Sequence, residues 1–350
     1  MVKNRPTIAD VAREAGVSKG LVSFALNDRP GVAPATRERI LRVADEVGWV
    51  PSVRARSLST DRSFALGLVI ARDPQILSGD PFFPAFIAGV ETALAEVEYA
   101  LVLSMVGSEQ AEIASYRKLS AHGRVDGVIL TDLRRDDPRI ALVAELGLPA
   151  VTLGHADAPS PIPAIVLDDT AGLRAVVAHL AALGHTRFAH VAGPGTMLHG
   201  ERRARTFAAA LAELGLPPGA IVETDFTAAD GARATQQLLA EVSTGEARRA
   251  ADRPTAIVYA NDPMAIAGLG VAQRLGIEVP RELSITGFDG SDVGAYLHPA
   301  LTTVTTAAAT WGRAAAEMLL RVVDFPSTPA ADVVLDPATL VIRNSTAPPL

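Results

Sequence analysis

The chain has 350 residues, a formal net charge of −7 and no cysteine. This length predicts two or three domains, and the lack of cysteine excludes disulfides, thiolate zinc sites, iron–sulfur clusters and cysteine nucleophiles. No apolar run reaches the roughly 18 residues of a membrane span. The first stretch, MVKNRPTIAD, has no apolar core of a signal peptide behind its basic residues. We therefore expect a cytoplasmic protein with no membrane partner.

The charge is unevenly distributed along the chain. Residues 1–60 hold ten Lys or Arg and six Asp or Glu, a charge of +4, so the remaining residues together carry −11. A basic segment beside an acidic body indicates that the first segment meets a polyanion such as nucleic acid. The body then has a different task.

The start of the chain carries the signals of two short helices. Thr7 and Asp10 have the spacing of a capping box, apolar residues follow at helical intervals, and Gly16 is a natural stop. Ser18 can cap a second helix over residues 19–26. The residues of this second helix that we expect to point inward are Val22, Ala25 and Leu26.

A third helix is predicted to begin at Pro34, which suits a first helical position, and to end at Gly48. Two short helices joined through a Gly-Val-Ser turn and followed by a third describe a helix-turn-helix unit. The same capping and periodicity also fit a generic three-helix bundle. The apolar stripe predicted for the third helix is Ile40, Leu41, Val43, Ala44 and Val47.

The ordered string of residues distinguishes these two interpretations. TIADVAREAGVSKGLVSFALN, residues 7–27, resembles the N-terminal unit of the LacI/GalR family of transcription regulators. RPGVAPATRERILRVADEVGWVPSVRARSLS, residues 29–59, resembles the third helix and hinge of the same family. The resemblance implies an all-α helix-turn-helix unit whose second helix enters the major groove of DNA.

The resemblance also implies which side chains contact DNA. Lys19 and Gly20 stand at the main specificity positions, and Lys19 can donate to guanine. Leu21 and Phe24 stand where the family usually has Thr and Arg, so they would touch thymine methyl groups instead, unless Phe24 packs inside the unit. The expected contacts to bases and phosphates are Thr7, Ser18, Lys19, Gly20, Leu21, Ser23, Phe24, Asn27, Thr36 and Arg37.

The segment SVRARSL, residues 52–58, is in isolation a linker, because a helix of this length is unstable in water. The resemblance implies a hinge helix that folds when two copies meet on DNA. One Leu58 side chain from each subunit would then enter a minor-groove step and kink the duplex. The expected hinge contacts are Ser52, Arg54, Ala55, Arg56 and Leu58.

The body alternates short apolar runs with stretches of helical periodicity, a pattern typical of parallel sheets covered on both faces. Eight such strands could close a barrel or form two sheets, and the restart of a strand–helix–strand unit at LDDTAGLRAVVAHLAALGHTRFAHVAG favours two lobes. The predicted strands are residues 64–70, 99–105, 126–131, 149–153, 164–168, 187–193, 256–260 and 283–289.

The body also resembles the periplasmic-binding-protein-like core of the LacI/GalR family, in segments such as ILTDL, PTAIVYANDPMAIAG, VPRELSITGFDGSDV and HPALTTV. The implied fold is α/β, with two doubly wound parallel-sheet lobes joined by three crossings, near residues 167, 291 and 323. The expected domains are a helix-turn-helix unit at 1–50, a hinge helix and linker at 51–61, an N-lobe at 62–166 and 292–323, and a C-lobe at 167–291 and 324–350.

Ligands of open parallel sheets sit beyond the C-terminal ends of the strands. Aromatic rings there can stack on a sugar or a base, an Arg suits vicinal hydroxyls or a carboxylate, and a strand-end Asp accepts from hydroxyls. The alternatives are that the Phe side chains only pack and that His155 is structural. Of the neighbouring pair Asn261 and Asp262, we expect Asn261 to contact the ligand and Asp262 to cap the next helix. Arg202 and Arg205 are predicted to be surface residues, and Gly290 stands where the family has a second Asp. The predicted effector contacts are Phe82, Phe83, His155, Arg203, Phe226, Asn261 and Asp289.

These features predict a ligand-responsive, DNA-binding transcription regulator: a homodimeric repressor of sugar-utilisation genes that binds a palindromic operator. The alternatives are a purine or nucleoside effector, an activator, or a small-molecule binder without DNA function. An enzyme is disfavoured, because no nucleophile–base pair, HExxH motif or phosphate loop is present. We expect no catalytic residue, cofactor or metal. The sequence STAPPL at the end has no leucine heptad, which favours a dimer over a tetramer.

Overall fold

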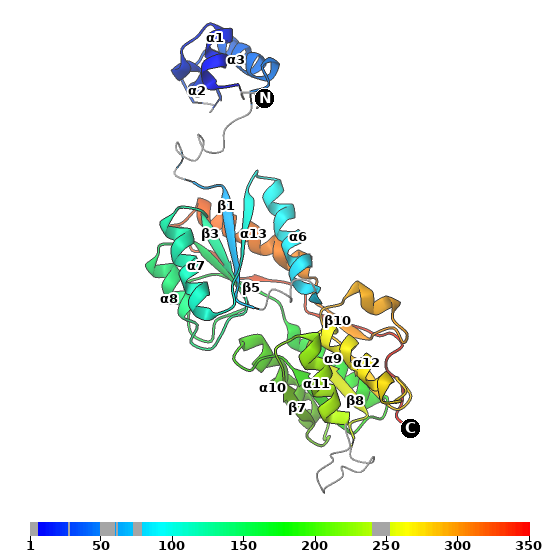
Figure 1. Ribbon diagram of the computed structural model, residues 1–350. Helices are drawn as coiled ribbons and strands as arrows, with labels where there is room; N and C mark the ends of the chain where they lie inside the picture. The colour runs from blue at the N-terminus through cyan, green and yellow to red at the C-terminus, as the bar shows by residue number, and fades with distance from the viewer. Residues whose placement is uncertain (1–5, 27–28, 50–59, 61, 73–78, 240–252) are drawn as a thin grey trace. The chain divides into compact units, whose positions relative to one another are not determined.

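The computed structural model describes residues 6–26, 29–49, 60, 62–72, 79–239 and 253–350. The chain divides into two compact units, residues 1–62 and residues 63–350, which we call the head and the core (Figure 1). In this described part of the chain, no helix is long and apolar enough to cross a membrane.

The head contains three helices, α1 (Ile8–Ala15), α2 (Lys19–Leu26) and α3 (Pro34–Glu46). The predicted capping box is present: the Thr7 hydroxyl accepts from the Asp10 amide, and the Asp10 carboxylate accepts from the Thr7 amide at 2.9 Å. Gly16 ends α1 in the left-handed conformation that its missing Cβ permits. Local capping therefore sets the length of α1.

The three helices of the head pack around a small apolar cluster that includes Val11, Val22 and Ile40. The prediction that Leu41 belongs to the buried stripe of α3 is wrong, because this side chain is 47% exposed. Ile40, Val43 and Ala44 recur at helical intervals on one face, and Leu41 lies about 100° around the helix from Ile40.

The first sheet of the core is a six-stranded parallel sheet with the order β11-β5-β4-β3-β1-β2. Its strands are β1 (Ala65–Ile70), β2 (Ala100–Met105), β3 (Gly127–Leu130), β4 (Ala150–Leu153), β5 (Ala164–Val166) and β11 (Val333–Val334). Its helices are α6 (Phe82–Ala95), α7 (Glu109–Ala121), α8 (Pro138–Glu145) and α13 (Ala308–Asp324).

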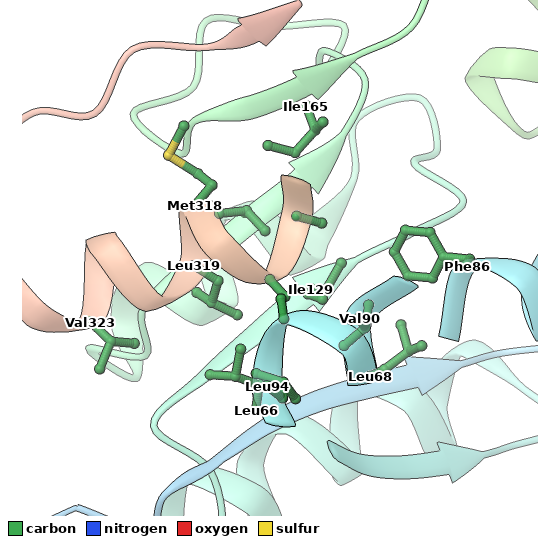
Figure 2. Close-up of a cluster of buried hydrophobic side chains, with 14 of the residues drawn as sticks. Leu66, Leu68, Phe86, Val90, Leu94, Ile129, Ile165, Met318, Leu319 and Val323 are labelled. Atoms are coloured by element: carbon green, nitrogen blue, oxygen red, sulfur yellow. The ribbon is translucent and has the colours of Figure 1, made fainter. Parts of the chain in front are cut away.

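Helices α6 and α13 cover one face of the first sheet, and their side chains interlock with strand residues such as Leu68 and Ile129 (Figure 2). The two helices cross in close contact because each has a glycine at the crossing point. A Cβ on Gly89 would lie 1.9 Å from the carbonyl oxygen of Ala309, and one on Gly312 would lie 2.0 Å from that of Phe86. Any larger residue at either glycine would force the helices apart.

The second sheet is parallel with the order β7-β6-β8-β9. Its edge strand β7 was not predicted from the sequence, because it has only four residues and half of them are exposed. The elements of this lobe are α9 (Asp169–Ala182), β6 (Phe188–Ala192), α10 (Leu198–Glu213), β7 (Ala220–Glu223), α11 (Ala228–Leu239), β8 (Ala256–Tyr259), α12 (Asp262–Arg274), β9 (Ser284–Thr286), and the 3-10 helix η2 (Asp292–Tyr296).

Two of the predicted lobe boundaries do not match the strand pairing. β10 (Thr303–Thr305) pairs with β12 (Thr339–Val341) and bridges to Asp289, so the chain is still beside the second sheet after residue 291. β11 pairs with β5 of the first sheet, so the chain has not left that lobe at residue 323. Both errors concern strands of two or three residues, whose partners are distant in sequence and leave no periodic signal.

Candidate functional site

The exposed face of α2 carries the predicted base-contacting residues. Lys19 and Gly20 are exposed at the first turn, and Phe24, one turn later, is 43% exposed. The alternative in which Phe24 packs inside the head is therefore not found. Its ring lies 5.9 Å from the guanidinium carbon of Arg29. The exposed face of α2 thus presents the charge of Lys19, the missing side chain of Gly20 and the apolar ring of Phe24.

The other described DNA candidates lie at the helix starts. The Ser18 hydroxyl accepts from the Leu21 amide at 3.2 Å, which caps α2. Thr36 and Arg37 lie in the first turn of α3, and the Arg37 guanidinium donates to the carbonyl of Arg29 at 2.7 Å. Ser23 and Leu21 are half-buried. Six predicted contacts lie outside the described residues: Asn27, Ser52, Arg54, Ala55, Arg56 and Leu58.

The core holds a cavity at the C-terminal strand ends of both sheets. All seven residues predicted as effector contacts line it, although they come from segments more than 200 residues apart. Its volume, measured as room for the centres of water-sized spheres, is about 70 Å³, several times the ~10–15 Å³ that one water requires. The lining residues are Arg72, Asp80, Phe82, Phe83, Thr131, Asp132, Leu133, Leu153, Gly154, His155, Asp169, Leu198, His199, Arg202, Arg203, Phe226, Asn261, Asp289 and Trp311.

A buried ion pair forms one wall of the cavity. Arg72, just after β1, donates to both carboxylate oxygens of Asp132, with Nε–Oδ2 at 2.6 Å and Nη2–Oδ1 at 2.5 Å. Its guanidinium carbon also lies 4.9 Å from the ring centre of Phe226 and 5.4 Å from that of Phe83. Burial alone would raise the pKa of Asp132, but the charge and hydrogen bonds of Arg72 outweigh it and hold that pKa below its usual value.

Asp132 is held from behind by a second buried cluster. Arg139, only 1% exposed, donates to the carbonyl oxygen of Asp132 at 3.0 Å. The same guanidinium pairs with Asp137 at 2.6 Å and with Glu112 at 2.7 Å. Asp132 has a positive φ of 52°, an unfavourable conformation for a residue with a Cβ. The Arg139 bonds therefore stabilise a strained loop that carries a cavity residue.

The opposite wall is built on Asp169, in the first turn of α9. Its carboxylate accepts from Arg203 Nε at 2.9 Å and from Arg202 Nε at 2.8 Å. Arg203 also donates to the carbonyl of Ala260 at 3.1 Å, and its guanidinium carbon lies 3.8 Å from the ring centre of Phe288. Burial tends to raise the pKa of Asp169, but the two arginines lower it overall. Arg202 thus belongs to the cavity lining rather than to the general surface, where it was predicted.

Among the described residues, two carboxylates of the cavity, Asp80 and Asp289, form no direct ion pair, although Arg72 and Arg203 lie close enough to act on them by charge. Asp80 accepts from the Phe82 amide through Oδ1 at 2.8 Å, and no other bond to its side chain is found among the described residues. The Asp289 carboxylate has no hydrogen-bond partner in this part of the chain, and its backbone has φ = 93°. Burial raises the pKa of both carboxyls, and the charge of Asp80 raises that of Asp289 further, while the charges of Arg72 and Arg203 offset part of each rise.

Asn261, which lines the cavity as predicted, also provides the cap of α12 that was predicted for Asp262. Asn261 is the N-cap of α12: its Oδ1 accepts from the Met264 amide at 3.0 Å, and its Nδ2 donates to the carbonyl of Phe226 at 2.8 Å. Both of its polar atoms are therefore engaged. Asp262 instead accepts from the Thr303 hydroxyl at 2.6 Å and the Ser291 amide at 2.5 Å, and burial raises its pKa to about 6.

Aromatic rings form the floor and rim of the cavity. Phe82 stacks on Phe86 and meets Trp311 edge-on at 5.7 Å, while Phe83 is almost fully buried. Phe226 stacks on His199 at 5.5 Å. Burial lowers the pKa of His199 to about 3, so this ring is neutral near pH 7. Phe82 and Phe226 thus offer ring surface to the lining, while Phe83 mainly packs.

His155 lies at the rim rather than inside. Its side chain is 61% exposed, and its Nε2 lies 2.9 Å from Asp332 Oδ2. Asp332 also accepts from the amide of Ala164 at 2.8 Å. His155 is therefore the predicted effector residue with the weakest claim to a place in the cavity.

The loop after β3 and the start of α10 join the two lobes beside the cavity. The Leu198 amide donates to the carbonyl of Leu133 at 2.8 Å, and Arg134 forms a bridge with Met197. Arg135 of the first lobe pairs with Glu201 of the second at 2.7 Å. Direct contacts between the lobes thus flank the cavity.

Eight polar or aromatic residues of the lining were not predicted from the sequence. Arg72, Asp132 and Asp169 directly follow predicted strands, so the strand-end rule that found Asp289 applies to them as well. Trp311 has no such signal, because it reaches the cavity from a helix that follows the second lobe in sequence. The full set is Arg72, Asp80, Thr131, Asp132, Asp169, His199, Arg202 and Trp311.

Comparisons with known proteins agree with this architecture. Residues 7–52 match the family described as bacterial regulatory proteins, lacI family, and residues 177–346 match a periplasmic binding protein-like domain. The HTH-type transcriptional regulator CelR of Thermobifida fusca is 33% identical over 98% of this chain and 99% of its own length. The HTH-type transcriptional repressor CytR of Escherichia coli is 31% identical over 97% and 96%.

Solved structures show the same fold. A transcriptional regulator CelR–cellobiose complex superimposes with a TM-score of 0.73 at 32% identity, covering 97% of this chain and all of that one. The lac repressor dimer bound to operator and the anti-inducer ONPF gives a TM-score of 0.83 at 27% identity, covering 98% and 100%. The relatives are transcription regulators rather than enzymes. This chain belongs to the LacI family of bacterial transcription regulators.

Proposed function

We propose that this protein represses sugar-utilisation genes by binding a palindromic operator as a homodimer, and that a sugar in the core cavity changes its affinity for that operator. One observation carries the proposal: carboxylates without a direct ion pair among the described residues, paired arginines and aromatic rings converge on one cavity of a chain whose head exposes a face of α2. The named CelR–cellobiose complex and the operator-bound lac repressor dimer support both halves.

The cavity chemistry favours a polyhydroxylated ligand. Asp289 and Asp80 offer acceptors for hydroxyl donors, and Phe82 and Trp311 offer apolar surface for the C–H face of a sugar ring. Buried acceptors that a ligand leaves unpaired cost binding energy, so ligands without donors at these places are disfavoured. The predicted contacts Phe82, Phe83, Arg203, Phe226, Asn261 and Asp289 are proposed as sugar-binding residues, with His155 at the entrance.

Both lobes contribute to the cavity, so a bound sugar favours whichever arrangement of the lobes lets it contact both. Such a difference in affinity is a coupling free energy, typically ~1–3 kcal/mol between an effector site and a DNA site. Residues 51–61 are proposed to transmit it as a hinge that forms a helix only on DNA. Residues 1–50 are proposed as the DNA-binding domain.

Operator binding is tested by fluorescence anisotropy with DNA from upstream of the protein's own gene and with a scrambled control of equal length. We expect tight binding of a dimer to the first DNA and a steep loss of affinity with salt, because phosphate contacts release counterions. Light scattering measures the mass of the protein alone and on DNA. No preference for the upstream DNA at low salt would refute the proposal.

The effector is tested by a thermal-shift screen with neutral sugars and nucleosides, followed by anisotropy with each hit. Trp311 lines the cavity, and Trp49, the other tryptophan of the chain, belongs to the head, so the Trp49→Phe variant gives a fluorescence signal from the cavity alone. A compound that lowers the affinity for operator DNA is an inducer, and one that raises this affinity is a corepressor. A response to nucleosides alone would replace the sugar by the alternative effector class.

The hinge is tested by Leu58→Ala. We expect this variant to lose operator affinity by at least about tenfold, because the wedge that stabilises the kinked duplex is missing. Its sugar affinity, measured by Trp311 fluorescence, should equal that of the unaltered protein. Equal losses in both assays would contradict a hinge role.

A further inference from the structure

The charges of the cavity do not balance among the described residues that line it. Three arginines, Arg72, Arg202 and Arg203, face four aspartates. Asp132 is paired with Arg72, and Asp169 with Arg202 and Arg203. This pairing leaves Asp80 and Asp289 as surplus acceptors.

We propose that Asp80 is a ligand-binding residue that, together with Asp289, restricts the cavity to uncharged polyols and excludes sugar phosphates and sugar acids. The inference rests on the proposed sugar-binding function and adds a charge rule to it. Asp80 reaches the cavity from the segment between β1 and α6, in the first lobe, and Asp289 follows β9 in the second. A ligand that donates hydroxyls to both therefore bridges the lobes.

Asp80 is fixed in position before any ligand arrives. Its Oδ1 accepts from the Phe82 amide at the start of α6, which leaves Oδ2 available as an acceptor in the cavity lining. The two aspartates are close enough for the charge of Asp80 to raise the pKa of Asp289. Hydroxyl donors from a sugar would relieve this repulsion without adding charge.

The arginines cannot receive an anion without losing existing partners. Arg72 makes two bonds to Asp132, and Arg203 is shared between Asp169 and the carbonyl of Ala260 while it lies on the ring of Phe288. A phosphate or carboxylate would have to break one of these buried pairs or lie beside unpaired aspartates. Like charges that have no partner are an effective way to reject a competing ligand.

The test uses the full-length protein and matched probes by calorimetry at pH 7.5. Glucose, galactose, maltose and cellobiose are each compared with their 6-phosphate and with their uronic acid. We expect neutral sugars to bind and every anionic counterpart of a binder to bind about 100-fold or more weakly, an effect of like-charge repulsion. An anionic member that binds as well as its neutral partner overturns the charge rule and leaves the sugar-binding proposal intact. If no sugar of either kind binds, the proposed effector class itself fails, and the charge rule with it.

The variants Asp80→Asn and Asp289→Asn assign the rule to these residues. Asparagine at position 80 keeps the oxygen that accepts from the Phe82 amide, so α6 retains its start. We expect each variant to bind the neutral sugar about tenfold more weakly and to narrow the neutral-to-anionic affinity ratio at least about tenfold. The matched control is Asp292→Asn, an exposed aspartate three residues after Asp289, which should leave both affinities unchanged.

A purely structural role for Asp80 predicts a different result. In that case Asp80→Asn would change the melting temperature at most and leave the affinity ratio at its original value, which would overturn the assignment. Asp289→Asn carries the same expectation independently, so the rule is still tested if one variant fails to fold. An unchanged ratio in both variants would refute the rule entirely.

Discussion

The head and the core position their functional residues in opposite ways. In the head, Lys19 and Phe24 are exposed on a short helix, and only the cap and a small apolar cluster beneath it are fixed. In the core, Arg72, Asp169 and Arg203 are buried and bonded to residues from distant segments. The head thus suits a partner that already has a regular structure, such as a DNA duplex. The core suits a small ligand that needs a preformed site.

The largest effect expected from this difference concerns Asp169. Asp169→Ala would leave Arg202 and Arg203 without their carboxylate, and breaking a buried ion pair costs about 3–5 kcal/mol. Urea unfolding followed by Trp311 fluorescence measures this loss for the core. The adjacent Asp168→Ala removes only the N-cap bonds of α9 and should cost about 1 kcal/mol. Equal costs for the two variants would mean that the buried pairing does not matter.

The next effect is a pH dependence confined to the core. His190 is fully buried, its Nδ1 is bonded to the carbonyl of Val258 at 2.8 Å, and burial lowers its pKa to about 4. Below pH 6.5 the unfolded chain binds a proton that the folded core does not. The stability from this group is therefore present at neutral pH and is lost as the pH falls from about 6.5 towards 4.

We expect His190 to lower the free energy of unfolding by about 2 kcal/mol between pH 7 and pH 5. His190→Gln should flatten the pH profile of the core by this amount, whatever its effect on stability at pH 7. His122→Gln, at the exposed end of α7, is the matched control. A slope that stays the same in His190→Gln would show that another group titrates.

A smaller effect is expected in the head, where the predicted DNA contacts are exposed. Lys19→Ala should weaken operator binding by about 1–2 kcal/mol and reduce its dependence on salt, since one contact to base or phosphate is lost. The melting temperature should not change, because Lys19 is exposed. Arg42→Ala on α3 removes an equal charge away from the predicted contacts. If it weakens binding as much, then the charge of the head as a whole, rather than the face of α2, determines affinity.

The smallest effect tests whether the head depends on local bonds. Thr7→Ala removes the capping box of α1 and should cost about 1 kcal/mol of head stability. Trp49 packs against the apolar cluster of the head, so its fluorescence in a Trp311→Phe background follows this unit alone. Thr7→Ser keeps the hydroxyl and should behave like the unaltered protein. A loss in both variants would assign the effect to the Thr methyl group.

The same contrast explains how far the sequence could be interpreted. The capping box, Gly16 and the start at Pro34 are local signals, and the structure confirms all three helices of the head. The seven residues predicted as effector contacts, most of them from the strand-end rule, do line one cavity. The sequence could not show that Asn261 also bonds to the carbonyl of Phe226, or that Arg202 and Arg203 share Asp169. In each case the partner lies more than 30 residues away in sequence.

The chain passes between the lobes after β5, between β10 and α13, and after β11. The first and last passages lie side by side, since Leu335 donates to the carbonyl of Val166 at 2.8 Å and Ala338 to that of Asp168 at 2.9 Å. Two backbone segments held together by hydrogen bonds would restrict the directions in which the two lobes can turn relative to each other. Ligands of different shape would then differ mainly in how far they rotate the two lobes about one common axis. New ligand specificities can in that way evolve through changes in the cavity, while the motion of the lobes stays the same.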